Sequence, residues 1–277
     1  MSSRGRRIIR AVAVAGGSAL LVGYVAFPLL WLARLSILPE PLLTELPPPW
    51  LFTPSVAGYR EVLTLHPFAK YLRNSLVVAL GSSTCAIVLG LPAAYSFVRF
   101  RFHGREPLSL AVLCVYVMPP IAMIIPLYVI YSRLGLLDTQ VALIVTHTSV
   151  TLPLSVWLLR GFVMRVPVEL EEAAQVDGCG RLEALWRVVV PIMAPGIAAT
   201  AILTFLYSWN DFIYAVILTG RGARTLPVMI SGFITEQAVY WDRVAAAGML
   251  VLLPTAILGV AVQRYLATGL SGGAVKG

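Results

Sequence analysis

The chain has 277 residues, of which 58% are hydrophobic and only 12% are charged, and its formal net charge is +8. A soluble globular protein carries about 25% charged residues, so this composition excludes an ordinary soluble domain. The basic residues gather at the ends of long apolar runs, which favours charge at a lipid surface over a nucleic-acid-binding face.

Six uncharged apolar runs divide the chain. Each is long enough to cross a bilayer as a helix, which takes roughly 20 predominantly apolar residues. Backbone groups inside a bilayer must be paired internally, so the runs predict an all-α integral membrane protein with a bundle of six spans. The runs are Ala11–Ala33, Asn74–Val98, Pro107–Ser132, Thr139–Leu159, Val188–Asn210 and Val244–Gln263. We expect the fifth to continue past Asp211 towards Thr219.

The first run follows a basic leader, "MSSRGRRIIR". It exceeds the roughly 7–15 residues of a signal-peptide apolar region, so we interpret it as a retained span. The segment Leu35–Arg73 follows outside the membrane. Its prolines, in "PEPLLTELPPPW", prevent a regular helix there, and "SVAGYREVLTLHPFAKYL" (residues 55–72) predicts a short surface helix. We therefore divide the chain into residues 1–73 and a membrane core of five spans, residues 74–277.

The orientation follows from the arginines near the span ends. They are denser on the side that carries the N-terminus, which predicts that both termini are cytoplasmic. The arginines on that side are Arg4, Arg6, Arg7, Arg10, Arg99, Arg101, Arg105, Arg160, Arg165, Arg181 and Arg187.

The third run contains three prolines in "VMPPIAMIIP", namely Pro119, Pro120 and Pro126. Each proline removes a backbone donor and bends a helix. Single prolines are common in membrane helices, but this cluster predicts a functional bend of the kind found in transporters.

The densest acidic block lies in the cytoplasmic loop 163–191, within "VPVELEEAAQVDGCGRLEALWRVVVP". Pro167 suits the first turn of a helix, and the glutamates that follow lie at its positive end. Gly178 can take the left-handed conformation that ends a helix, and "RLEALWRVVV" predicts a second short helix that returns to the membrane at Pro191. On composition alone, this helix–turn–helix is equally well an interfacial loop that holds two spans apart.

The residue pattern of this loop is more specific than its composition. "EAAQVDG" followed by "VVVP" resembles the EAA loop of bacterial ABC importer permeases, with Val188 and Val190 in place of the usual Ile and Leu. Further segments resemble the carbohydrate branch, and within it the shorter permease subunit of maltose-type transporters. These segments are "IIPLYVIYSRLGLLDTQVALI", "LPLSVWLLRGF", "SWNDFIYAVILT", "TLPVMI" and "GLSGGAVKG".

The resemblance covers Asn74–Gly277 and implies the six-span fold of type I ABC importer permeases in a bacterial or archaeal cytoplasmic membrane. It implies that the loop docks into a cytoplasmic ATPase. It further implies two copies of that ATPase, a second permease subunit and an extracytoplasmic solute-binding protein for a sugar. The tail "GGAVKG" is either a further contact with the ATPases or an ordinary flexible end. The coupling residues carried over by position are Glu172, Ala173, Ala174, Asp177, Gly178 and Pro191.

Nucleotide hydrolysis requires a P-loop with a lysine after its glycines. The chain has only Lys70 and Lys276, and neither belongs to such a loop. We therefore expect no cofactor on this chain, with ATP and Mg²⁺ bound by the partner ATPase. The three cysteines and three histidines share no metal-ligand spacing, so we expect no metal site.

Polar residues within spans are costly and mark candidate solute contacts. The fourth run contains "THTSVT" and the fifth "YSWNDF". Neutral sugars are held by hydrogen bonds and flat aromatic faces, whereas the same residues can also lock helices together. We hypothesise that His147 lines the pathway, and a gating or structural role is as plausible for "WND". The candidate pathway residues are His147, Thr151, Tyr207, Trp209, Asn210 and Asp211.

Three other functions compete with a sugar importer subunit. An intramembrane enzyme needs a catalytic constellation, and the sequence does not bring His147 and Asp211 together. An ion channel needs a filter or a charged pore ring, which the sequence lacks. The third alternative is a permease for amino acids or peptides, which shares the EAA loop.

Overall fold

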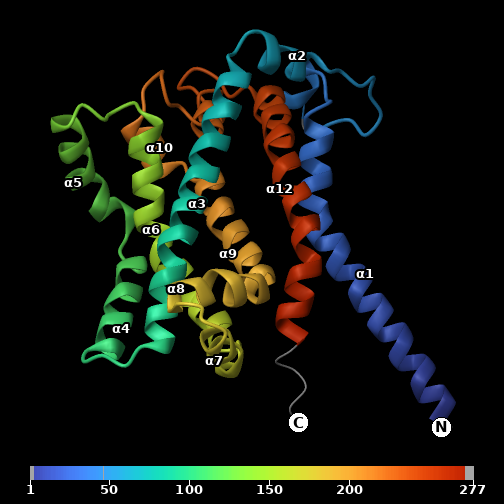
Figure 1. Cartoon of the computed structure of the whole chain (residues 1–277). Coiled ribbons are helices and arrows are strands. Elements are labelled where there is room, and N and C mark those ends of the chain that lie inside the picture. Colours follow the sequence, from blue (N-terminus) through green and yellow to red (C-terminus); the bar gives the residue numbers. More distant parts are fainter. Residues whose placement is uncertain (1–2, 46, 272–277) are drawn as a thin grey trace. The chain divides into compact units, whose positions relative to one another are not determined.

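The computed structural model describes residues 3–45 and 47–271 (Figure 1). These residues are almost entirely helical, and within them β pairing is limited to an isolated antiparallel bridge between Ile234 and Val239. The all-α prediction is therefore confirmed. The elements are α1 (Ser3–Leu35), η1 (Glu40–Thr44), α2 (Ala57–Thr64), α3 (Phe68–Arg99), α4 (Arg105–Tyr116), α5 (Pro120–Arg133), α6 (Gln140–Val163), α7 (Val168–Val176), α8 (Arg181–Ala184), η2 (Leu185–Val189), α9 (Val190–Asn210), α10 (Ile213–Leu218), α11 (Leu226–Ser231) and α12 (Trp241–Ser271).

Five helices are long and apolar enough to cross a membrane, and α4 with α5 makes a sixth span if the bent pair is counted as one. The two helices of this pair meet at 88°. Pro119 is extended at the break and Pro120 begins α5, so the predicted proline bend is present. The five continuous segments are Ala13–Leu35, Phe68–Arg99, Gln140–Val163, Arg181–Asn210 and Trp241–Val260.

One sequence prediction about a helix boundary is wrong. The fifth span does not run through to Thr219, because α9 ends at Asn210, Asp211 is extended and α10 starts at Ile213. The predicted short surface helix is present as α2, which covers only part of residues 55–72. There α2 stops at Thr64 and α3 begins after Pro67, because a proline disfavours helical geometry in the residue before it.

The chain divides into two compact units. One comprises the chain up to Phe68 together with Ile230–Leu253, and the other comprises Ala69–Met229 with the chain from Pro254 onwards. In the first unit, the Arg34 guanidinium lies 5.0–5.4 Å from the ring centres of Trp31, Trp50 and Phe52. Such cation–π contacts hold the end of α1 against the proline-rich segment that follows it.

The second unit contains the candidate site. Its core includes two buried apolar clusters, one around Leu159 and Leu185 and the other around Leu143 and Leu218. In this unit α6 packs against α4 and α9, and α10 packs against α5 and α6. Close approach of α6 and α9 requires Gly196, because a Cβ there would lie 2.4 Å from the ring of Phe162.

The loop from α10 to α11 is held by the carboxylate of Asp138. Asp138 has a left-handed backbone (φ 58°), and its oxygens accept the N–H groups of Gly220, Gly222 and Ala223 at 2.8–3.0 Å. Asn74 donates to the carbonyls of Gly222 and Arg224, both at 3.0 Å. Side chains before α6 and early in α3 therefore fix a loop distant in the sequence.

We expect Gly196→Ala to destabilise the protein, because the new methyl group must displace the Phe162 ring. Overpacking of a filled interface costs about 1–3 kcal/mol. Thermal unfolding of the purified protein measures the effect. Gly161→Ala on α6 is the matched control, because its Cβ would meet nothing within 4 Å. Equal melting temperatures for the two variants would contradict the close packing of α6 on α9.

We expect Asp138→Asn to loosen the loop from α10 to α11, with a loss of about 1–2 kcal/mol from the charge-assisted hydrogen bonds. Trypsin cleavage at Arg221 and Arg224 should then accelerate, whereas Glu236→Gln, which alters an exposed carboxylate, should leave it unchanged.

The same clamp predicts a pH dependence. Burial raises the pKa of the Asp138 carboxyl, but the N–H donors of the loop outweigh burial and hold this pKa below its ordinary value. The stabilisation is therefore complete above the ordinary pKa of about 3.9 and is lost as the pH falls through the lowered folded value. The difference in melting temperature between wild type and Asp138→Asn should shrink over that range, and a constant difference would contradict the clamp.

Candidate functional site

The acidic loop forms a helix, a glycine turn and a second helix. Pro167 is the residue before α7, and Glu169 and Glu171 lie in the first turn, where the positive helix end favours carboxylates. Gly178 has φ +94°, and the N–H of Cys179 bonds the carbonyl of Ala174 at 3.0 Å. A left-handed glycine therefore ends α7, as the sequence predicts.

The second helix of the loop differs from the prediction. It is not a separate short helix, because Arg181–Asn210 forms one continuous span. Its second turn, η2, is π-helical, with the N–H of Val190 bonded to the carbonyl of Leu185. This wider turn precedes Pro191, which cannot donate a backbone hydrogen bond, so the helix passes the proline without ending.

The turn presents most of the predicted coupling residues to the surface. Glu172, Ala173, Asp177, Gly178 and Pro191 are exposed, and Ala174 is half-buried. Large apolar side chains flank them, with Val176 88% and Leu182 71% exposed. The loop therefore offers an acidic and apolar surface around a narrow alanine patch.

One carboxylate of the block points inward instead. The side chain of Glu171 is only 3% exposed, and its Oε1 lies 2.6 Å from Nη2 of Arg99 at the end of α3. The hydroxyl of Tyr95 donates to Oε2 at 2.7 Å. This contact was not predicted from the sequence. The four-residue spacing of Tyr95 and Arg99 places them on one helix face, but nothing in the sequence pairs that face with Glu171.

A second polar group lies where α9 gives way to α10. His147 of α6 is fully buried, with Nδ1 2.6 Å from the Ser208 hydroxyl and Nε2 3.2 Å from Oδ2 of Asp211. The same Oδ2 accepts the N–H of Ala215 at 3.1 Å. Because a carboxylate accepts, Nε2 carries the proton of this contact. The structure thus joins His147 and Asp211, which the sequence alone did not bring together.

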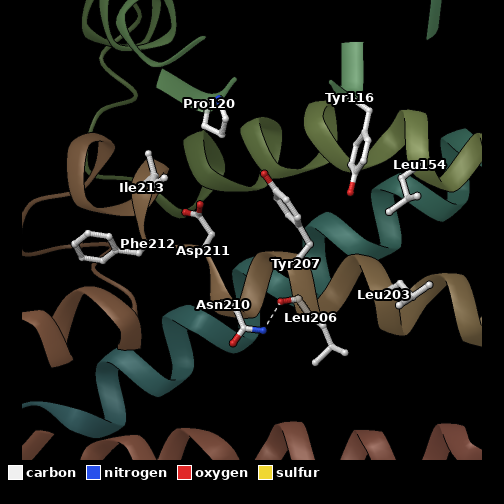
Figure 2. Close-up of a pocket in the computed structure, with 10 residues that line it drawn as sticks. All are labelled: Tyr116, Pro120, Leu154, Leu203, Leu206, Tyr207, Asn210, Asp211, Phe212 and Ile213. Atoms are coloured by element: carbon white, nitrogen blue, oxygen red, sulfur yellow. Dashed lines mark hydrogen bonds between the residues drawn. The ribbon is translucent and has the colours of Figure 1, made fainter. Parts of the chain in front are cut away.

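A cleft of about 700 Å³ opens beside this group (Figure 2). It extends from the α4–α5 break to the α9–α10 break, so both interrupted helices contribute to its wall. Figure 2 shows the ring of Tyr207 and the carboxylate of Asp211 on the same side of α9. The lining residues are Tyr116, Pro120, Leu154, Leu203, Leu206, Tyr207, Asn210, Asp211, Phe212 and Ile213.

The six predicted pathway residues therefore fall into two groups. Tyr207, Asn210 and Asp211 line the cleft, and the amide of Asn210 donates to the carbonyl of Leu206 at 2.8 Å. His147, Thr151 and Trp209 are buried among the helices. The Thr151 hydroxyl donates to the carbonyl of His147 in its own helix, and the Trp209 ring stacks on Phe205.

Among the described residues, no group of three His, Cys, Asp or Glu side chains could hold a metal ion. The tail segment "GGAVKG" (residues 272–277) lies outside the described residues.

This chain is similar to known transport permeases over most of its length. The trehalose transport system permease protein SugB of Mycobacterium tuberculosis is 35% identical over 93% of this chain and 95% of its own length. The trehalose/maltose transport system permease protein MalG of Thermococcus litoralis is 32% identical over 98% of both chains.

Solved structures show the same fold. A chain of a bacterial ABC transporter involved in the import of the acidic polysaccharide alginate matches with a TM-score of 0.77 at 20% identity, covering 96% of this chain and 99% of that chain. The predicted fold of type I ABC importer permeases is thereby confirmed. Residues 86–272 match the family described as binding-protein-dependent transport system inner membrane component. This chain therefore belongs to that family of multi-pass membrane transport proteins.

Proposed function

We propose that this chain is the permease subunit of an ATP-driven sugar importer, that it forms half of the translocation pathway, and that its exposed EAA turn couples it to a separate ATPase. The observation that carries the proposal is the turn itself, an exposed acidic and apolar surface on a chain whose sequence contains no P-loop. Family membership makes the chain a transport component, which sets aside the intramembrane enzyme.

The relatives support a sugar as the solute, because they are named for trehalose and maltose transport. Their names favour a sugar over an amino acid or peptide. The cleft supports the same conclusion, because Tyr116 and Tyr207 supply flat rings while Asn210 and Asp211 supply polar groups. The solute is a mono-, di- or oligosaccharide. Its pathway includes Tyr207, Asn210 and Asp211 as lining residues, with His147, Thr151 and Trp209 supporting them from behind.

The remaining partners follow from the same proposal. Two cytoplasmic ATPase subunits bind ATP and Mg²⁺, a second permease subunit forms the other half of the pathway, and an extracytoplasmic solute-binding protein delivers the sugar. Glu172, Ala173, Ala174, Asp177 and Gly178 contact the ATPase, and Pro191 begins the return of the chain into the membrane. Both termini are then cytoplasmic, in the cytoplasmic membrane of a bacterium or archaeon.

We expect Gly178→Val to weaken the association with the ATPase. Valine is strained at φ +94°, so the turn must change its angle, and a non-glycine residue in this region costs roughly 1–2 kcal/mol. A pull-down of the tagged chain from membranes, with bound ATPase and ATP hydrolysis assayed, measures the loss. Gly180→Val is the matched control, because Gly180 is also exposed but has φ −68°. If wild type brings down no ATPase, the proposed function is wrong; equal losses in both variants would exclude a role for the turn angle.

We expect His147→Ala to impair sugar uptake. It removes one partner of a hydrogen-bonded polar pair, and the loss of such a partner costs about 1–3 kcal/mol locally. Uptake rate, apparent affinity and solute preference in membrane vesicles are the measurements. Thr200→Val is the control, because the buried Thr200 hydroxyl bonds only the Gly196 carbonyl of its own helix at 2.8 Å. Unchanged affinity and solute preference in His147→Ala would contradict a role in the pathway.

A further inference from the structure

The Arg99 side chain connects three helices of the second unit, α3, α6 and α7. It is the last residue of α3, its side chain is 11% exposed, and its Nε and Nη2 atoms lie 2.7 and 2.6 Å from Oε1 of Glu171 on α7. Nη2 also donates to the carbonyls of Val163 and Val166, at 3.3 and 2.7 Å. Val163 is the last residue of α6, and its carbonyl also accepts the N–H of Val166 at 3.2 Å. One guanidinium therefore binds the end of α6 and the inner face of α7 together.

Tyr95 completes the contact from one turn earlier on α3. Its hydroxyl donates to the second oxygen of Glu171 at 2.7 Å, so both carboxylate oxygens are held by α3. The Tyr95 ring stands edge-on to Phe100, with centroids 6.0 Å apart. Glu171 cannot rotate or slide without breaking hydrogen bonds to two side chains whose own positions are fixed by packing.

Burial alone does not account for a charged group at this position. The surrounding cluster contains Leu91, Leu185 and Val189, all at most 1% exposed, and apolar side chains would fill the space as well. A buried ion pair adds little net stability over apolar residues of similar volume, whereas its hydrogen bonds fix direction. Its effect here is to set the orientation of α7 relative to α3 and α6.

The exposed coupling residues begin at the next position along α7. Glu172 and Ala173 face outwards while Glu171 faces inwards. A force applied to the exposed surface of α7 therefore acts directly on Glu171. On its other side α7 packs against α8 and η2, which continue into α9. The anchor therefore gives α7 a directional connection to α3 and α6 in addition to its connection to α9.

We infer that Glu171, Arg99 and Tyr95 form a strut that transmits movement of the docked coupling turn to α3 and α6. Glu171 is a positioning residue in this scheme, since it does not contact the ATPase. This inference rests on the proposed function, because it requires an ATPase docked on the turn. It separates two properties that the turn alone would combine: binding of the ATPase and conversion of ATP hydrolysis into transport.

The test uses the complete importer in lipid vesicles, with its ATPases, second permease and solute-binding protein. Three quantities are measured for each variant: co-purified ATPase, ATP hydrolysis with and without loaded binding protein, and sugar taken up per ATP hydrolysed. Glu171→Gln removes the charge with little change in shape. We expect normal ATPase binding and basal hydrolysis, with uptake per ATP lowered by about tenfold, within the usual range of coupling between sites.

Glu169→Gln is the matched control, because Glu169 is an exposed glutamate two residues before Glu171 on the same helix. It should leave uptake per ATP at the wild-type value. Tyr95→Phe keeps the ring and deletes one hydrogen bond, so we expect a smaller loss of about two- to fivefold. The double variant Arg99→Met with Glu171→Leu replaces the pair by apolar side chains; it should remain folded and bind the ATPase but stay poorly coupled.

The outcomes distinguish failure of the strut from failure of the proposed function. Wild-type uptake per ATP in both Glu171→Gln and Tyr95→Phe overturns the strut, and so does full coupling in the apolar double variant. Loss of co-purified ATPase in a folded Glu171→Gln variant also overturns it, because Glu171 would then act in docking. If wild type itself shows no ATP hydrolysis stimulated by loaded binding protein, the proposed function fails and the strut fails with it.

Discussion

Unpaired backbone groups at helix ends are the constraint on which this structure depends. An apolar chain in a bilayer has no water to bond the last carbonyls and first N–H groups of each helix. The few charged side chains of this protein meet that need at three places. Arg99 binds the last carbonyl of α6 and the carbonyl of Val166 just beyond it, Asp211 accepts an N–H of α10, and Asp138 accepts N–H groups of the loop after α10. The break between α9 and α10 therefore lies where a polar side chain is available, whereas the break between α4 and α5 lies at prolines.

Polar contacts near both ends of α6 link it to the α9–α10 break and to the region of the proposed coupling turn. His147 lies in the second turn of this helix and contacts the α9–α10 break, while Val163 at its end is bound by Arg99. Sixteen residues of helix separate them, which is about 24 Å at 1.5 Å per residue. In the proposed scheme, α6 carries a displacement of α7 towards the cleft. Apolar packing along α6 supplies cohesion but little direction.

The sequence predicted those features that depend on local chemistry. The uncharged runs follow from composition. The break before α5 follows from the missing donor of proline, and the left-handed Gly178 follows from the steric limits of other residues. The sequence did not predict the features that depend on contacts between residues distant in the chain. Helix α9 ends at Asn210 because Asp211 turns to His147 and the N–H of Ala215, and the partner of Glu171 is 72 residues away. A list of acidic residues does not show that one of them faces inwards.

The buried contacts of Glu171 beneath the proposed coupling turn restrict the positions that α7 can take. Apolar side chains slide past each other with small changes in energy, so they permit a continuum of helix positions. A carboxylate held by a guanidinium and a phenol has one favoured geometry, and displacing the helix requires the whole group to move with it. Transport between two discrete states needs elements that move as units. The buried ion pair makes α7, the end of α3 and the end of α6 one such unit.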